Sequence, residues 1–223
     1  MHKHPLVSKW IYGLLLIPFV SGIFALQTHQ FVFKAGVAGS GILILMLLHL
    51  NRKHSAKDWW LIAGAFLFSI GGDWCLSNRH GETGMFVAGI ALFFFAHVSY
   101  LWYGLSNGRL HRSFTLILLA GYLAFFFLKL YPSINEQLLM WAALIYLLIS
   151  CFSLGAAAGI KANTVVKWAY ILGISLILFS DTIIAFKEFA GWKTLNFLIL
   201  PTYYLAQISI TLSLMLKKNL NTV

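Results

Sequence analysis

The chain has 223 residues, of which 60% are hydrophobic and only 10% are charged, and its mean hydropathy is +0.83. Soluble proteins are about 45–50% apolar and about 25% charged, so this composition excludes a water-soluble globular fold. The net charge of +10 would suggest a nucleic-acid partner in a soluble chain. In a membrane protein it is typical of cytoplasmic loops rich in Lys and Arg, so we expect an integral membrane protein and no nucleic-acid partner.

Eight apolar segments follow one another along the chain, and a membrane helix needs about 20 mostly apolar residues. The connections between them are short, and the ten-residue alternation of a membrane β-barrel is absent. The sequence therefore predicts an all-α polytopic membrane protein, a compact bundle of eight transmembrane helices in a single domain over residues 1–223. The predicted spans are 9–26, 35–50, 58–77, 84–106, 113–131, 137–158, 165–186 and 194–216.

The first span is interpreted as a retained helix, because it is longer than the apolar region of a signal peptide and lacks a clear cleavage site. Of the 16 Lys and Arg residues, 11 fall on the side of the membrane that carries both termini, and 5 fall on the other side. The positive-inside rule then predicts that both termini lie in the cytoplasm. We expect a multi-pass protein of a bacterial inner membrane. The two cysteines, Cys75 and Cys151, fall at different depths, so we expect no disulfide between them.

Two of the six acidic residues, Asp73 and Asp181, lie inside predicted spans rather than at their ends. Inserting a carboxylate near the centre of a bilayer costs up to ~2.5–3.5 kcal/mol, so a functional use is the default expectation. Asp73 is 16 residues beyond Lys57 and Asp181 is 16 residues beyond Val165, in spans that run in the same direction. At ~1.5 Å per residue both lie about 24 Å into a core of roughly 30 Å, at one level. The alternative is that each carboxyl group joins two helices as a structural hydrogen bond.

Further polar side chains on the fourth and eighth spans accompany the aspartates. His97 and Tyr100 share one helix face, and so do Tyr204 and Gln207. Any one of them is more typical of a hydrogen bond between helices. Together with the aspartates they indicate a polar cavity that opens on the outer side. In the outer loops, Arg79, Lys187 and Lys193 are either interface anchors or a rim that binds a phosphate group.

Four short motifs in this order resemble the YhhN-like lysoplasmalogenase family of membrane enzymes over essentially the whole chain. They are Gly72-Asp73, His97-x-x-Tyr100, Ser180-Asp181 and Tyr204-Leu205-Ala206-Gln207. The resemblance implies hydrolysis of the vinyl ether bond of lysoplasmalogens, with a fatty aldehyde and glycerophosphoethanolamine or glycerophosphocholine as products. It also implies a lysoplasmalogen and membrane lipids as partners, and it assigns the catalysis to the two aspartates.

Acid–base chemistry by two carboxyl groups suits this reaction. A vinyl ether is hydrolysed by protonation of its β carbon, which leaves an oxocarbenium ion that water then attacks. This requires a proton donor and a carboxylate, as in glycosidases, but no metal, cofactor or nucleophilic serine. Because two nearby carboxyl groups in a low dielectric do not both ionise easily, one should keep its proton.

The sequence offers a division of roles between the two aspartates. The apolar flanks of Asp181 favour it as the acid, which makes Asp73 the base, with Ser69 and Ser77 one turn away as hydrogen-bond partners. The residues expected to orient substrate or water are His97, Tyr100, Ser180, Tyr204 and Gln207.

Two other classes of function remain compatible with these residues. A proton-coupled transporter of small molecules or lipids would use Asp73 and Asp181 as a proton site. Transport sites usually lie near the midplane on broken helices, which disfavours this interpretation. A metal-dependent lipid hydrolase would use the two aspartates and His97 as ligands. A zinc site favours more nitrogen or sulfur ligands than this, and the sequence shows no Cys/His ligand spacing.

Overall fold

The computed structural model describes residues 11–52 and 56–217, and within them every membrane-crossing element is helical. The eight crossing segments agree with the predicted spans to within four residues at each described end. The first two predicted residues of span 9–26 lie outside the described residues. The crossing segments are Ile11–Thr28, Phe31–Leu50, Lys57–Ser77, Thr83–Ser106, Arg112–Ser133, Gln137–Ala158, Thr164–Phe189 and Asn196–Leu216.

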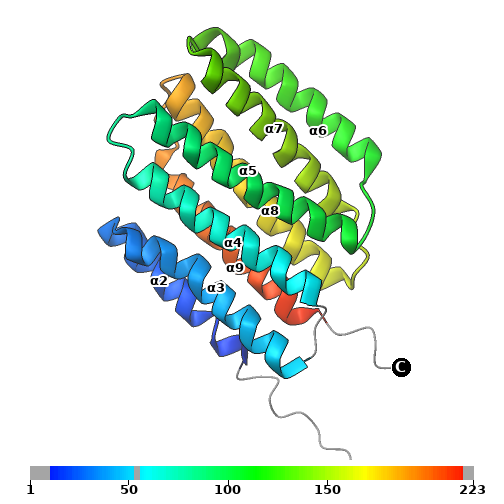
Figure 1. The fold of residues 1–223 in the computed structure, drawn as a ribbon. Coiled ribbons are helices and arrows are strands. Elements are labelled where there is room, and N and C mark those ends of the chain that lie inside the picture. The colour runs from blue at the N-terminus through cyan, green and yellow to red at the C-terminus, as the bar shows by residue number, and fades with distance from the viewer. Residues whose placement is uncertain (1–10, 53–55, 218–223) are drawn as a thin grey trace, which may run out of the picture.

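Eight α-helices form these segments, because a chain in lipid must satisfy its backbone hydrogen bonds internally. Figure 1 shows them packed lengthwise beside one another. They are α2 (Leu16–Thr28), α3 (Phe31–Arg52), α4 (Ala56–Ser77), α5 (Thr83–Ser106), α6 (Arg112–Phe125), α7 (Gln137–Ala158), α8 (Thr164–Phe189) and α9 (Ile199–Leu216).

The chain departs from regular α-helical geometry at two places near one end of the bundle. After α6 the chain forms a π-helical turn, Phe126–Leu130, and then a 3₁₀ turn, Tyr131–Ser133. Pro132 explains the end of the helix, because proline has no N–H to donate and its ring clashes with the preceding turn. A second 3₁₀ turn, Asn196–Leu198, precedes α9. Pro201 is tolerated there because it lies in the first turn of α9, whose N–H groups have no helical partner.

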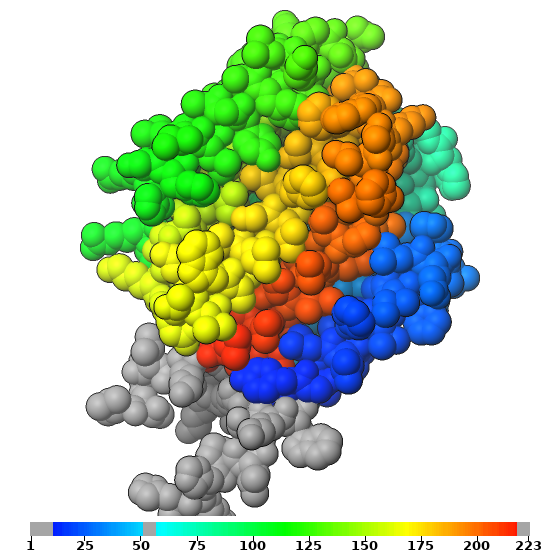
Figure 2. Space-filling model, turned by 180° about the vertical axis from the view of Figure 1, so that it is seen from behind, coloured from blue at the N-terminus to red at the C-terminus, as the bar shows by residue number. Residues whose placement is uncertain are grey.

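The helices form two rows. In one row α3, α4, α5, α7 and α6 lie side by side, and α6 is the outermost helix of that row. Behind it, α9 packs against α2, α3 and α8, and Figure 2 shows α8 and α9 crossing the rear face. Short loops make consecutive helices antiparallel, so α4 and α8 run in the same direction. We call the end where they finish, and where α5 and α9 begin, the site end; the opposite end is the far end.

Large buried side chains fill the middle of the bundle, among them Phe66, Tyr100, Tyr103 and Tyr170. Many large apolar side chains on the outer faces are exposed, which is expected of helices that face lipid. Cys75 and Cys151 are both buried and unpaired, as the sequence predicts.

Candidate active site

A polar cavity of about 280 Å³ opens at the site end between α4, α5, α8 and α9. Both intramembrane aspartates line it, as predicted from their matched depth in two parallel helices. Three basic side chains from different elements also line it, namely Lys34, Arg79 and Lys187. The fold therefore gathers two carboxyl groups and a set of cations into one chamber.

Asp73 lies one turn before the end of α4, and only 8% of the residue is exposed. The Tyr203 hydroxyl donates to its Oδ2 over 3.2 Å. The neighbouring Gly72 admits the ring of Phe93 from α5, because a Cβ at that position would lie 2.7 Å from the ring. The Gly-Asp pair thus brings an aromatic wall of the cavity directly against the helix that carries the carboxyl group.

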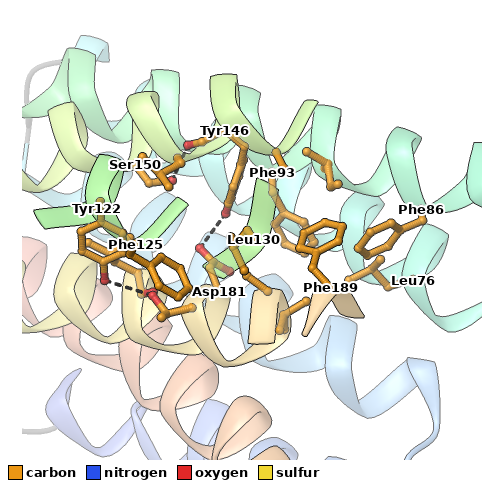
Figure 3. A pocket seen from close by; sticks show the side chains of 17 residues that line it. Leu76, Phe86, Phe93, Tyr122, Phe125, Leu130, Tyr146, Ser150, Asp181 and Phe189 are labelled. Carbon is orange, nitrogen blue, oxygen red and sulfur yellow. Dashed lines mark hydrogen bonds between the residues drawn. The ribbon is translucent and has the colours of Figure 1, made fainter. Parts of the chain in front are cut away.

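Asp181 lies two turns before the end of α8, and 15% of its side chain is exposed. The Tyr146 hydroxyl, from α7, donates to its Oδ2 over 2.6 Å (Figure 3). His97 Nε2, from α5, lies 3.5 Å from the same oxygen, and the His97 and Tyr146 ring centroids are 5.3 Å apart. Three helices therefore converge on one oxygen of this carboxyl group.

An apolar pocket of about 80 Å³ adjoins the polar cavity and is the one drawn in Figure 3. Its walls come mainly from Phe, Leu, Ile and Ala side chains of α5, α6, α7 and α8. Five residues line both spaces: Leu76, Phe86, Phe93, Asp181 and Ile184. Asp181 is thus the one carboxyl group among the described residues that faces the polar and the apolar compartment.

The mouth of the polar cavity is a charged network. Glu188 accepts from Arg79 Nη2 over 2.8 Å, and its other oxygen lies 3.0 Å from Lys187 Nζ. Lys34 Nζ donates to the Ser77 hydroxyl over 3.2 Å. The guanidinium carbon of Arg79 lies 5.0 Å from the centroid of the Phe86 ring. With three cations and one carboxylate, the mouth of the cavity has a net positive charge, which favours an anionic group such as a phosphate.

Comparison with known proteins identifies the relatives of this chain. Residues 30–214 match the sequence profile of the YhhN family. The chain belongs to the YhhN family. It is also 31% identical to lysoplasmalogenase TMEM86B of Rattus norvegicus, in an alignment that covers 99% of this chain and 90% of the relative. No solved structure matches the chain. The resemblance predicted from the four short motifs is thereby confirmed, and the protein is an integral multi-pass membrane protein of this family.

The predicted orienting residues of this YhhN-family protein divide into two groups. His97 lies beside Asp181, and the Tyr100 ring lies 6.0 Å from that of His97, both deeply buried. Ser180 lines the polar cavity, but its hydroxyl donates to the Ile199 carbonyl over 2.9 Å, so it joins α8 to α9. For these three residues an orienting role remains a prediction.

Three other predicted residues are, like His97 and Tyr100, absent from the walls of the two cavities, and their predicted roles also remain predictions. Tyr204 packs against Ala25 and Val37 on the side of α2 and α3. Gln207 is 1% exposed in the interior of the bundle. Lys193 lies in the loop before the 3₁₀ turn and is absent from the cavity wall, whereas Arg79 and Lys187 of the predicted rim are part of it.

Four residues of the YhhN-family site were not predicted as site residues: Lys34, Tyr146, Glu188 and Tyr203. Tyr146 stands in an uninterrupted apolar run of α7, where a tyrosine resembles packing surface. Tyr203 is the neighbour of the predicted Tyr204, and one helical step of about 100° turns it toward Asp73 instead. A signal for Glu188 was available, because it directly follows the predicted rim residue Lys187 in the same outer segment.

Potential metal ligands do not cluster in the part of the chain that the structure describes. No group of three or more His, Cys, Asp or Glu side chains lies close enough together there to hold an ion. The observed geometry therefore adds no support to the metal-dependent interpretation.

Proposed function

We propose that this protein is a lysoplasmalogenase, which hydrolyses the vinyl ether bond of lysoplasmalogens by acid–base catalysis with Asp73 and Asp181. The similarity to a rat lysoplasmalogenase supports a hydrolase of this kind. One observation carries the finer proposal. Two aspartates line a single polar cavity with a basic mouth, and one of them also faces an apolar pocket.

The two compartments suit the parts of a lysoplasmalogen. Its phosphate is an anion, its glycerol is polar, and its single long chain begins at the vinyl ether. The cations Lys34, Arg79 and Lys187 would bind the phosphate through charge-assisted hydrogen bonds. The apolar pocket would take the first carbons of the chain, because their transfer out of water is favourable. The vinyl ether, between polar and apolar parts, then lies where the two compartments meet, in the cavity that both aspartates line.

The chemistry requires one carboxyl group that carries a proton and one that does not. Both carboxyl groups are largely shielded from water, and such a cavity disfavours two charges close together. Carbon protonation and activation of water then fall to two different side chains. Protonation of the double bond is the difficult step, and a positioned acid contributes about 10²–10⁴-fold to such steps.

Purified protein in detergent should release aldehyde from lysoplasmenylethanolamine but not from its saturated alkyl ether analogue. Release should persist in the presence of a chelator and should be lost in Asp73→Asn and Asp181→Asn, both checked for folding by thermal unfolding. Loss with chelator would instead indicate a metal-dependent hydrolase. Folded wild-type protein that releases no aldehyde would refute the proposed function and direct attention to proton flux in liposomes.

A further inference from the structure

The two aspartates differ sharply in the donors that surround them. The carboxyl oxygen Oδ2 of Asp181 accepts a short hydrogen bond of 2.6 Å from Tyr146. A second group that can donate, His97 Nε2, lies 3.5 Å from the same oxygen. Hydrogen bonds donated to a carboxyl oxygen stabilise its ionised form, and they are strongest when the acceptor is charged.

Asp73 has a poorer set of partners. Among the described residues its one side-chain hydrogen bond comes from Tyr203 over 3.2 Å, and only 8% of the residue is exposed. Ser69 and Ser77, the partners expected from sequence, are not hydrogen-bonded to it in the described structure; Ser77 accepts from Lys34 instead. A carboxyl group that is buried with few donors is better suited to the neutral form.

We propose that Asp181 acts as the carboxylate and Asp73 as the proton donor, with Tyr146 as a positioning residue that holds Asp181. This assignment rests on the proposed function and deepens it. It reverses the roles expected from the apolar sequence flanks of Asp181. Of those flanking residues, Leu178 lines the apolar pocket together with Asp181, but the carboxyl oxygen Oδ2 itself meets side chains from α5 and α7.

With these roles, every proton and electron pair of the catalytic cycle is accounted for. The proton of Asp73 moves to the β carbon, the carbon–carbon π bond supplies the electron pair, and the neighbouring carbon and ether oxygen share the positive charge. Water then forms a bond to that carbon while Asp181 accepts its proton. The hemiacetal collapses as Asp181 returns this proton to the glyceryl oxygen and Asp73 takes the hydroxyl proton. The products are an aldehyde and an alcohol, and both carboxyl groups return to their starting forms.

Tyr146 orients the carboxyl group by fixing one oxygen. Because Oδ2 is held by the Tyr146 hydroxyl, Oδ1 is the oxygen that remains for water and for the developing cation. Loss of the hydroxyl should therefore weaken the chemical step more than substrate binding, and the Phe variant removes only that one atom.

The first test compares Tyr146→Phe with Tyr170→Phe on lysoplasmenylethanolamine. Tyr170 is also a buried tyrosine in the bundle, but its hydroxyl donates to the Tyr100 carbonyl over 2.9 Å and it lines neither of the two cavities. Tyr146→Phe should lower kcat roughly 10–100-fold, the effect of losing a hydrogen bond to a charged group, with KM within about twofold. Tyr170→Phe should keep kcat within about twofold of wild type.

The second test uses formate, which is ionised at neutral pH and is small enough to replace a missing carboxylate. In Asp181→Ala, added formate should restore aldehyde release by at least about tenfold, because it can accept the proton of water. In Asp73→Ala, formate should restore nothing, because ionised formate has no proton to give.

Several outcomes would overturn the assignment. The positioning role would be refuted if Tyr146→Phe kept the wild-type kcat, if both tyrosine variants lost activity equally, or if only KM changed. Rescue of Asp73→Ala and not of Asp181→Ala would reverse the two aspartates. In each of these cases wild-type protein still releases aldehyde, so the proposed function survives; absence of wild-type activity refutes both.

Discussion

The two ends of the bundle hold similar polar side chains in opposite arrangements. At the far end, Lys217 Nζ donates over 2.6 Å to Asp58 Oδ2 and over 2.6 Å to Asn107 Oδ1. The Asn107 amide in turn donates to Asp58 Oδ1 over 2.9 Å. At the site end, Asp73 has one side-chain hydrogen bond among the described residues, and Asp181 faces two hollow compartments.

The difference separates a structural network from a site. The far-end residues satisfy one another within the protein, and the pocket that Asp58 and Lys217 line is only about 20 Å³. A larger hollow at that end, about 400 Å³ beside Lys57 and Trp102, contains no residue of this network. A backbone bridge between Gly108 and Ile160 also joins the α5–α6 and α7–α8 loops at this end. At the site end, cations and carboxyl groups surround about 280 Å³ of space. Polar groups arranged around a hollow are available to a ligand, while groups that pair with one another hold helices together.

The largest effect should come from the site-end carboxyl groups. Asp73→Asn and Asp181→Asn should each lower aldehyde release at least about 10²–10⁴-fold, since each removes an acid or a base. Neither should lower the unfolding temperature measurably, because the amide has the size of the carboxyl group and adds no charge inside the membrane. Thermal unfolding in detergent beside the aldehyde assay measures both. A variant that unfolds early would place that aspartate with the structural network instead.

A change at the far end should lower the stability of the fold and leave the activity nearly unchanged. Asp58→Ala leaves Lys217 and Asn107 without their shared partner and should destabilise the fold by about 1–3 kcal/mol, less than a fully buried pair because both charges are partly exposed. Activity per folded molecule should stay within about twofold of wild type. A large fall in kcat with unchanged stability would contradict the division between the two ends.

Filling the apolar pocket should slow the reaction of chains of any length, because the pocket takes the carbons nearest the vinyl ether. Ala143 lines this pocket on α7, whereas Ile145 on the same helix is 49% exposed on the outer face. Ala143→Phe should lower kcat/KM for lysoplasmenylethanolamine about tenfold, as each excluded methylene forfeits about 0.8 kcal/mol. Ile145→Phe should keep kcat/KM within about twofold of wild type. Equal kcat/KM in both variants would show that the chain binds elsewhere.

The smallest effect should come from the mouth of the polar cavity. Arg79→Gln removes one of three cations and should raise KM for lysoplasmenylethanolamine about 3–10-fold, with kcat within about twofold. The headgroup-free 1-alkenylglycerol offers a matched comparison, because it has no phosphate and its KM should not change. A similar rise for both lipids would mean that Arg79 shapes the cavity and does not recognise phosphate.

The course of the helices was predictable from hydropathy, because the bilayer fixes both the length of a span and its apolar composition. The same logic identified Asp73 and Asp181, since a charge inside a span is costly. Depth counted along two parallel helices placed them correctly in one cavity. Beyond depth, the sequence carries little information on which helix lies next to which.

The partners of the two aspartates depend on that missing information. Tyr146 meets Asp181 because α7 packs against α8 while α6 lies at the edge of the bundle. Tyr203, and not Tyr204, meets Asp73 because of the rotation of α9 about its axis. Such rotations are set by side-chain packing between helices and are not encoded in local hydropathy.

The position of both cavities at one end of the bundle would give the proposed reaction a direction across the membrane. A lysoplasmalogen bound there would insert its chain from the leaflet at the site end, so lipids of the opposite leaflet would reach the two aspartates only after they cross the bilayer. The water-soluble alcohol would then leave into the compartment on that side, while the aldehyde would stay dissolved in the hydrocarbon. Loop charges predict that this compartment lies outside the cytoplasm. The protein would thus separate its two products by phase and by compartment as it forms them.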